Sequence, residues 1–189
     1  MGRRGLGVPH RGRRGALVAG ADDRQVVEVQ IGRSLRADSE VVARCHLGLP
    51  VVIRVPPHLD DSTPFPTLYW LTCPLATTRI GRLEGSGGVK RMESKAAADP
   101  EFAEALESAH RAYEAERDRL VTETATPRPS GGVGGTREGV KCLHAHYAHH
   151  AAGGENPVGR LVADWIEPLD CEVRCVVDGG MNPEWVNRP

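Results

Sequence analysis

The first half of the chain alternates short apolar runs with turn residues. A helical stretch that can begin at Asp22 and end at Gly32 comes first. Three runs rich in β-branched and aromatic residues follow it, at residues 41–43, 51–55 and 67–72. Glycine and proline separate these runs, so we predict a small antiparallel three-stranded sheet.

The second half is dominated by apolar positions spaced three or four residues apart. After Asp99 and Pro100, a typical helix start, this spacing continues to about residue 121 and predicts a helix. Shorter segments of the same kind are expected at residues 75–83, 138–152 and 157–165. The pattern as a whole predicts an α+β fold in which a small antiparallel three-stranded sheet packs against four or five helices.

The length of 189 residues is enough for one hydrophobic core and does not require a second. We expect a single α+β domain over residues 22–168, with a flexible loop of glycine, proline and threonine at residues 122–135. The arginine- and glycine-rich residues 1–21 are expected to form a disordered basic tail. Residues 169–189 show no clear periodicity and are expected to form an irregular C-terminal tail.

Composition and charge argue against several classes of function. The net charge of −1 gives no global attraction to nucleic acid, and the one strongly basic segment is the N-terminal tail. No apolar run approaches the roughly 20 residues of a membrane helix. No glycine-rich stretch has the spacing of a phosphate-binding loop, so no nucleotide cofactor is expected. Five cysteines without an export signal favour a cytoplasmic location over a secreted disulfide framework.

The richest chemistry lies in residues 142–150, which contain four of the eight histidines and one cysteine. Imidazole and thiolate groups are common ligands of zinc and related metals near neutral pH. On a helix, Cys142, His146 and His149 would share an arc roughly 100° wide. His144 would point to the apolar side, as a core histidine, a buried acid–base residue or a further ligand.

A single helix supplies two or three ligands, so a complete metal site needs another from elsewhere in the fold. Cys73, at the end of the strongest predicted strand, is the preferred candidate. We therefore predict one zinc or other divalent transition metal ion, held by residues drawn from Cys142, His146, His149, Cys73 and His144. The sequence leaves open whether this metal would be structural or catalytic.

Two other functions fit the same residues. In a non-enzymatic interaction module, the histidines would simply lie on an exposed helix face. In a metal-independent enzyme, Cys142 or Cys73 would be the nucleophile, and His144 or His146 would be its base. The chain has no Gly-x-Ser-x-Gly or His-Glu-x-x-His motif, so the sequence does not support a serine hydrolase or a zinc hydrolase of the latter type.

Three strings of the chain resemble one bacterial family. They are Thr-Pro-Phe-Pro-Thr-Leu-Tyr-Trp-Leu-Thr-Cys-Pro at 63–74, Gly-Val-Lys-Cys-Leu-His-Ala-His at 139–146 and Ala-Gly-Gly-Glu-Asn-Pro-Val-Gly at 152–159. Together they resemble the mainly actinobacterial family named domain of unknown function 501, over roughly residues 22–177. The resemblance implies no established activity, substrate or cofactor. Members are often encoded near a septum-formation initiator protein and an exopolyphosphatase-like enzyme. This association suggests a role in cell division or envelope physiology, with a protein partner there, or in phosphate metabolism.

Overall fold

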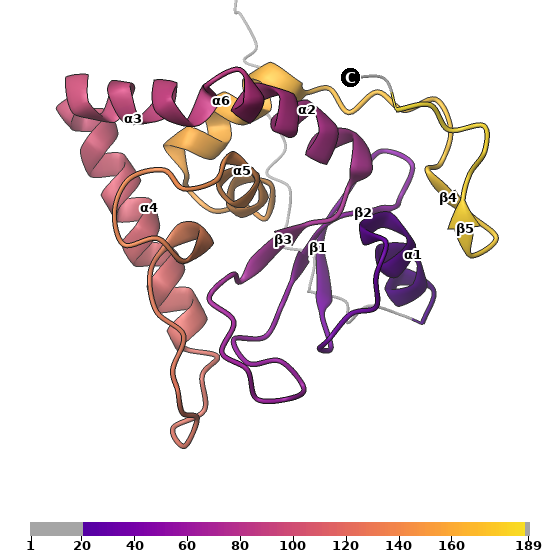
Figure 1. The fold of residues 1–189 in the computed structure, drawn as a ribbon, viewed down its shortest axis with the longest axis horizontal. Coiled ribbons are helices and arrows are strands. Elements are labelled where there is room, and N and C mark those ends of the chain that lie inside the picture. The colour runs from indigo at the N-terminus through magenta and orange to yellow at the C-terminus, as the bar shows by residue number, and fades with distance from the viewer. Residues whose placement is uncertain (1–20, 188–189) are drawn as a thin grey trace, which may run out of the picture.

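The computed structural model describes residues 21–187 (Figure 1). Within this range, six α-helices accompany one three-stranded antiparallel sheet and a separate two-stranded hairpin. The structure therefore confirms the α+β class and the small antiparallel sheet, with one helix more than the largest number expected. The tail expected at residues 1–21 lies outside the described residues, apart from residue 21.

The sheet is built from three neighbouring segments, β1 (Glu40–Arg44), β2 (Pro50–Arg54) and β3 (Tyr69–Leu71). The strand order is β1-β2-β3, and both pairs are antiparallel. Val41, Ile53 and Trp70 align across one face of the sheet. Val52 and Leu71 align across the other face, because successive side chains of a strand point to opposite sides.

Six helices accompany this sheet. They are α1 (Ala21–Ile31), α2 (Pro74–Gly85), α3 (Gly88–Ala98), α4 (Pro100–Asp118), α5 (Leu143–Ala151) and α6 (Pro157–Ile166). α4 begins as the sequence predicts, because the Asp99 side chain accepts a hydrogen bond from the Phe102 N–H group at 3.1 Å. α3 is the helix that the sequence does not predict. Gly85, Gly87 and Gly88 indicate a helix stop, but only Ser86 and Gly87 lie between α2 and α3. None of the helices in residues 21–187 is long and apolar enough to cross a membrane.

Two segments that lack a clear periodicity contain ordered elements. After α6, β4 (Val176–Val177) and β5 (Gly180–Met181) form a short antiparallel hairpin beside α1 (Figure 1). Before α5, the chain forms a 3-10 turn, η1 (Val133–Gly135), which contacts α4 and α5. Gly131, Gly132 and Val133 are buried in this arrangement, so the end of the loop belongs to the packed interior.

The side chains pack into two clusters on opposite faces of the sheet. The inner core lies between one face and the helices α2, α4, α5 and α6, with Val52 and Leu143 fully buried in it. α5 is central to this core and packs against β3 and α6. The outer cluster joins Val27 of α1 to Val41 and Ile53 on the other face. Neighbouring residues of β2 therefore contribute to different clusters.

Arg117, near the end of α4, has a fully buried side chain. Its guanidinium group donates one hydrogen bond to the backbone carbonyl of Gly131 and another to Oδ1 of Asp118, at 2.9 Å from Nη2. The hydrogen bond to Gly131 connects the end of α4 to the loop that leads to α5. The side chain of Arg117 thus supports the packing of the inner core from one end.

Arg117→Ala is expected to lower the free energy of unfolding by about 2–4 kcal/mol, because a buried side chain is lost and the Gly131 carbonyl loses its donor. Urea denaturation followed by circular dichroism measures this change. Arg119→Ala is the matched control, since Arg119 is exposed at the same end of α4 and its loss is expected to cost less than about 0.5 kcal/mol. Equal stabilities of the two variants would contradict the role assigned to Arg117.

Candidate metal-binding site and buried histidine network

α5 starts at Leu143, later in the chain than the helix expected from residue 138. Cys142 is its N-cap residue and has an extended backbone, with φ −154° and ψ 120°. Its side chain does not cap the helix; Glu84 from the end of α2 accepts the hydrogen bond of the Leu143 N–H group instead, at 2.6 Å from Oε1. Because Cys142 precedes the helix, it does not share the helical arc expected for it with His146 and His149.

The cap brings Glu84 to two residues that the sequence analysis selects, Cys142 and His144. One carboxylate oxygen of Glu84, the sulfur of Cys142 and a ring nitrogen of His144 all lie within 4.8 Å of one another. The Nδ1 atom of His144 is 3.3 Å from Oε1 of Glu84 and 3.7 Å from Sγ of Cys142. All three side chains are half-buried. An oxygen, a sulfur and a nitrogen ligand atom thus face one point between α2 and α5.

The ring of His144 is oriented by a hydrogen bond on its other side. Its Nε2 atom lies 3.2 Å from the backbone carbonyl of Thr77 in α2. A carbonyl oxygen only accepts, so Nε2 carries the proton in the neutral ring and the lone pair of Nδ1 faces Cys142 and Glu84. Metal-binding histidines are commonly oriented by a hydrogen bond of this kind.

The electrostatic environment of His144 favours a positive charge at Nδ1. Burial by itself lowers the pKa of His144, but the hydrogen bond with Cys142 and the charge interactions with Cys142 and Glu84 outweigh it and raise the pKa to about 9. A proton at this nitrogen is stabilised by Cys142 and Glu84, the same two side chains that would bind a metal cation beside His144. Proton and metal would therefore compete for Nδ1.

His146 and His149 belong to a different arrangement on the core side of α5. Oδ1 of Asn156, the N-cap of α6, accepts a hydrogen bond from the Gly159 N–H group at 2.8 Å, which fixes the orientation of the side-chain amide. Nδ1 of His146 lies 3.1 Å from the same oxygen and must donate to it. The amide nitrogen of Asn156 donates in turn to Nδ1 of His149, at 3.2 Å. One asparagine thus connects two of the four histidines of α5, His146 and His149, to α6.

Aromatic side chains enclose these two histidines. The ring of His149 stacks on Tyr69, with centroids 5.8 Å apart, and meets the edge of Tyr113 at 5.1 Å. His146 packs edge-on against His110 of α4 at 5.6 Å, and no described residue forms a hydrogen bond with its Nε2 atom. Burial lowers the pKa of His146 to about 3 and that of His149 to about 4, so both rings are neutral at physiological pH.

Cys73 lies outside both arrangements. It is the N-cap residue of α2, directly before Pro74, and it is buried in the inner core. Burial raises the pKa of the Cys73 thiol to about 11, so the group is protonated at neutral pH and behaves as a small apolar side chain. Of the five residues expected to ligate a metal, the structure brings together Cys142 and His144.

Two residues in these arrangements are absent from the sequence-based selection. Glu84 follows the helix predicted at residues 75–83 and is not selected, because its contact with α5 spans 59 residues of the chain. Asn156 appears only as a helix start. The glycines on either side of Asn156 are a sequence signal for the close packing of this segment against α5. A Cβ atom at Gly154 would lie 2.0 Å from Nε2 of His149, and one at Gly159 would lie 2.2 Å from the His146 carbonyl oxygen. Both positions therefore require glycine for the close approach to α5.

The fold and these side chains define an α+β protein with a half-buried carboxylate, thiol and imidazole group at the start of a helix. A family model described as protein of unknown function (DUF501) matches residues 41–164, and the chain belongs to this family. The match includes the residues of both arrangements and confirms the family resemblance noted in the sequence. No curated protein and no solved structure matches the chain.

The buried state of His149 predicts a pH dependence of stability. A histidine in the unfolded chain has a pKa near 6.5, whereas the pKa of folded His149 is about 4. Below pH 6.5 the unfolded chain binds more protons, so the stability that neutral His149 contributes is complete above that pH and is lost as pH falls towards 4. Between pH 7.5 and 5.5, the contribution of His149 to the free energy of unfolding is expected to fall by about 1.3 kcal/mol.

The measurement is the difference between the free energies of unfolding in urea at the two pH values. His149→Phe keeps the aromatic packing against Tyr69 and Tyr113 and removes the titration, so this difference should shrink by about 1.3 kcal/mol. His110 and His150 remain in the variant. A positive charge on either of them would repel a positive charge on His149. His46→Phe, at an exposed histidine, should retain the difference of the parent protein. An unchanged difference in His149→Phe would show that His149 is not held neutral.

Proposed function

We propose that the protein binds one divalent transition metal ion, zinc or a close relative, through Glu84, Cys142 and His144. The observation that carries the proposal is the convergence of three ligand atoms within 4.8 Å. Sulfur, nitrogen and oxygen are the ligand types that zinc uses in proteins. A thiolate and a carboxylate together supply two negative charges, which match the charge of the ion.

The spacing of the ligand atoms supports a tetrahedral ion. Zinc bonds of about 2.0 Å to nitrogen and oxygen and about 2.3 Å to sulfur place tetrahedral ligand atoms about 3.3–3.5 Å apart. The 3.3 Å between His144 and Glu84 and the 3.7 Å between His144 and Cys142 are close to these separations. Small side-chain movements would therefore be enough to accommodate the ion.

Three protein ligands leave a fourth position for water or a substrate atom. Structural zinc sites usually have four protein ligands, whereas an open position is typical of catalytic sites, where zinc lowers the pKa of bound water. The three side chains are half-buried, so the proposed site lies at the edge of the protein interior. A reduced Cys142 thiolate is needed throughout, which fits the cytoplasmic location that we propose.

Metal binding is tested on the full-length protein, purified without a polyhistidine tag and stripped with a chelator. We expect one Zn²⁺ per chain by elemental analysis and, with Co²⁺, the near-ultraviolet absorption of a thiolate–cobalt bond. Cys142→Ser should abolish this absorption and weaken zinc binding by at least about tenfold, because one of three ligands is lost. Cys171→Ser is the matched control, since Cys171 is another half-buried cysteine outside the group, and should retain both signals.

Glu84→Gln separates metal binding from helix capping. Glutamine keeps an oxygen that can accept from the Leu143 N–H group but removes the negative charge. Weaker zinc binding with little change in melting temperature would support the proposal. The proposal fails if the stripped protein takes up no stoichiometric zinc, or if Cys142→Ser binds zinc as tightly as the parent.

A second candidate function is thiol chemistry at Cys142. It is favoured by the 3.7 Å contact between Sγ of Cys142 and Nδ1 of His144, at the N-terminus of α5, where helix N–H groups favour a thiolate. In a relay of nucleophile, base and carboxylate, the two partners of the histidine occupy different ring nitrogens. Here Glu84 and Cys142 face the same nitrogen, which favours the metal site.

Alkylation with iodoacetamide at pH 7 tests the thiol candidate. In metal-free protein we expect Cys142 to react faster than the buried Cys73, and His144→Gln to slow that reaction, because the adjacent imidazole no longer stabilises the thiolate. Saturating Zn²⁺ should protect Cys142 if the metal site is correct. Mass spectrometry of the labelled peptides gives both rates. A labelling rate for Cys142 that is unaffected by His144→Gln would eliminate this second candidate.

A further inference from the structure

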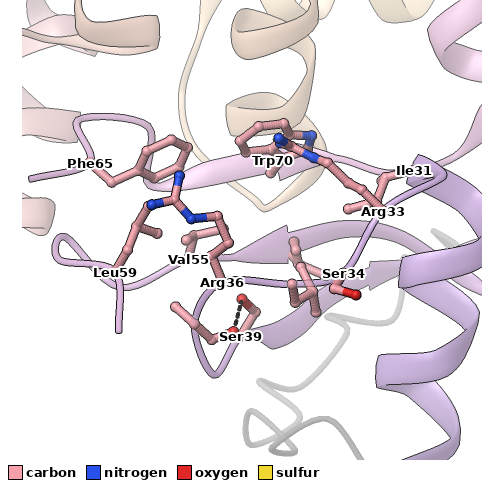
Figure 2. A pocket seen from close by; sticks show the side chains of 12 residues that line it. Ile31, Arg33, Ser34, Arg36, Ser39, Val55, Leu59, Phe65 and Trp70 are labelled. Carbon is pink, nitrogen blue, oxygen red and sulfur yellow. Dashed lines mark hydrogen bonds between the residues drawn. The ribbon is translucent and has the colours of Figure 1, made fainter. Parts of the chain in front are cut away.

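The outer face of the sheet carries a hollow that the metal site does not use. It lies above Ile53 and Trp70 and is enclosed by α1 and by the loops around residues 33–39 and 55–65 (Figure 2). Its volume is about 120 Å³. It lies on the face of the sheet opposite the inner core that contains α5.

The walls of this hollow are apolar and partly aromatic. Leu35, Val55 and Leu59 line it together with the stacked rings of Phe65 and Trp70, whose centroids are 5.4 Å apart. An apolar cavity of about 150 Å³ in another protein binds benzene. The hollow is therefore of a size that admits one aromatic ring or a short branched alkyl group.

Two arginines add positive charge at the rim. The guanidinium group of Arg33 lies over the ring of Trp70, 4.7 Å from its centroid, and no carboxylate in residues 21–187 forms an ion pair with it. Arg36 pairs with Asp61 at 2.5 Å, but both side chains of this pair are more than half exposed. Figure 2 shows Arg33 beside Trp70 and Arg36 beside Phe65. The charge of Arg33 in particular is not neutralised within the described chain.

We propose that this hollow binds a small organic anion, in which a ring or short branched alkyl group is attached to a carboxylate or phosphate. The apolar part would occupy the space between Leu59, Val55 and Trp70. The anionic group would lie between Arg33 and Arg36, since guanidinium groups match both headgroups in shape and charge.

The chain itself offers a poor substitute for such a ligand. Residues 1–20, which precede α1, contain five arginines and no aspartate or glutamate. Their side chains would add positive charge to the rim and would not neutralise Arg33. Charge complementarity thus points to a separate anionic molecule, whether or not a metal ion binds at α5.

The test uses the full-length protein labelled with ¹⁵N and three probes: 3-phenylpropionate, 4-methylpentanoate and phenyl phosphate. At least one probe should produce saturable shifts of the Trp70 indole N–H signal and of the backbone amides of residues 33–39. The uncharged analogue 3-phenylpropan-1-ol should bind at least about tenfold more weakly, because charge-assisted hydrogen bonds to arginine are lost. Tighter binding of the carboxylates or of the phosphate supports the proposal and identifies the headgroup.

Arg33→Gln should weaken binding of the strongest probe by about tenfold without lowering the melting temperature, because Arg33 is exposed. Arg82→Gln is the matched control, at an exposed arginine on α2, and should leave binding unchanged. Four results would overturn the proposal. They are the absence of saturable shifts with all three acids, equal binding of the alcohol, unchanged binding by Arg33→Gln, and nuclear Overhauser contacts from residues 1–20 to the Trp70 ring.

Discussion

The side-chain amide of Asn156 makes three hydrogen bonds in a buried position, and they fix how α5 is rotated about its axis. Its oxygen caps α6 and holds His146, while its nitrogen holds His149. Each helical residue advances by about 100°, so a residue two positions before an inward-facing histidine points away from the core. His144 is that residue, and it therefore faces α2 and Glu84. The positions of the buried histidines His146 and His149 therefore determine the direction in which the His144 side chain points.

Much of the fold follows from local signals in the sequence. The three strands and α4 are predicted because their β-branched runs and the Asp99 cap act over a few residues. The separation of His144 from the buried pair His146 and His149 does not follow from local sequence signals. Sequence periodicity extends the helix back through Cys142, whereas the carboxylate that caps α5 comes from Glu84, 59 residues earlier. The three-ligand group could not be predicted because one member and the helix boundary both depend on a long-range contact.

Burial separates the histidines of α5 into two chemical types. His146 and His149 are enclosed by aromatic rings and lose the ability to carry charge at physiological pH. His144, only two residues before His146, lies beside the Glu84 carboxylate and the Cys142 sulfur, which raise its pKa. One short helix thus presents an uncharged, hydrogen-bonded face to the interior and, at its start, a histidine that can carry a positive charge.

The central strand has a further consequence for folding. Val51, Val52 and Ile53 are all apolar, yet Val52 packs into the inner core and Ile53 into the outer cluster. A slip of one residue would exchange these two faces, and the hydrophobic pattern alone discriminates weakly against it. The selection of the correct pairing therefore falls to the connection between β1 and β2. There the Cys45 N–H group bonds to the Leu49 carbonyl at 3.0 Å, and Gly48 adopts φ +81°. A turn of a few residues, outside every candidate binding site, sets the alignment on which both faces of the protein rely.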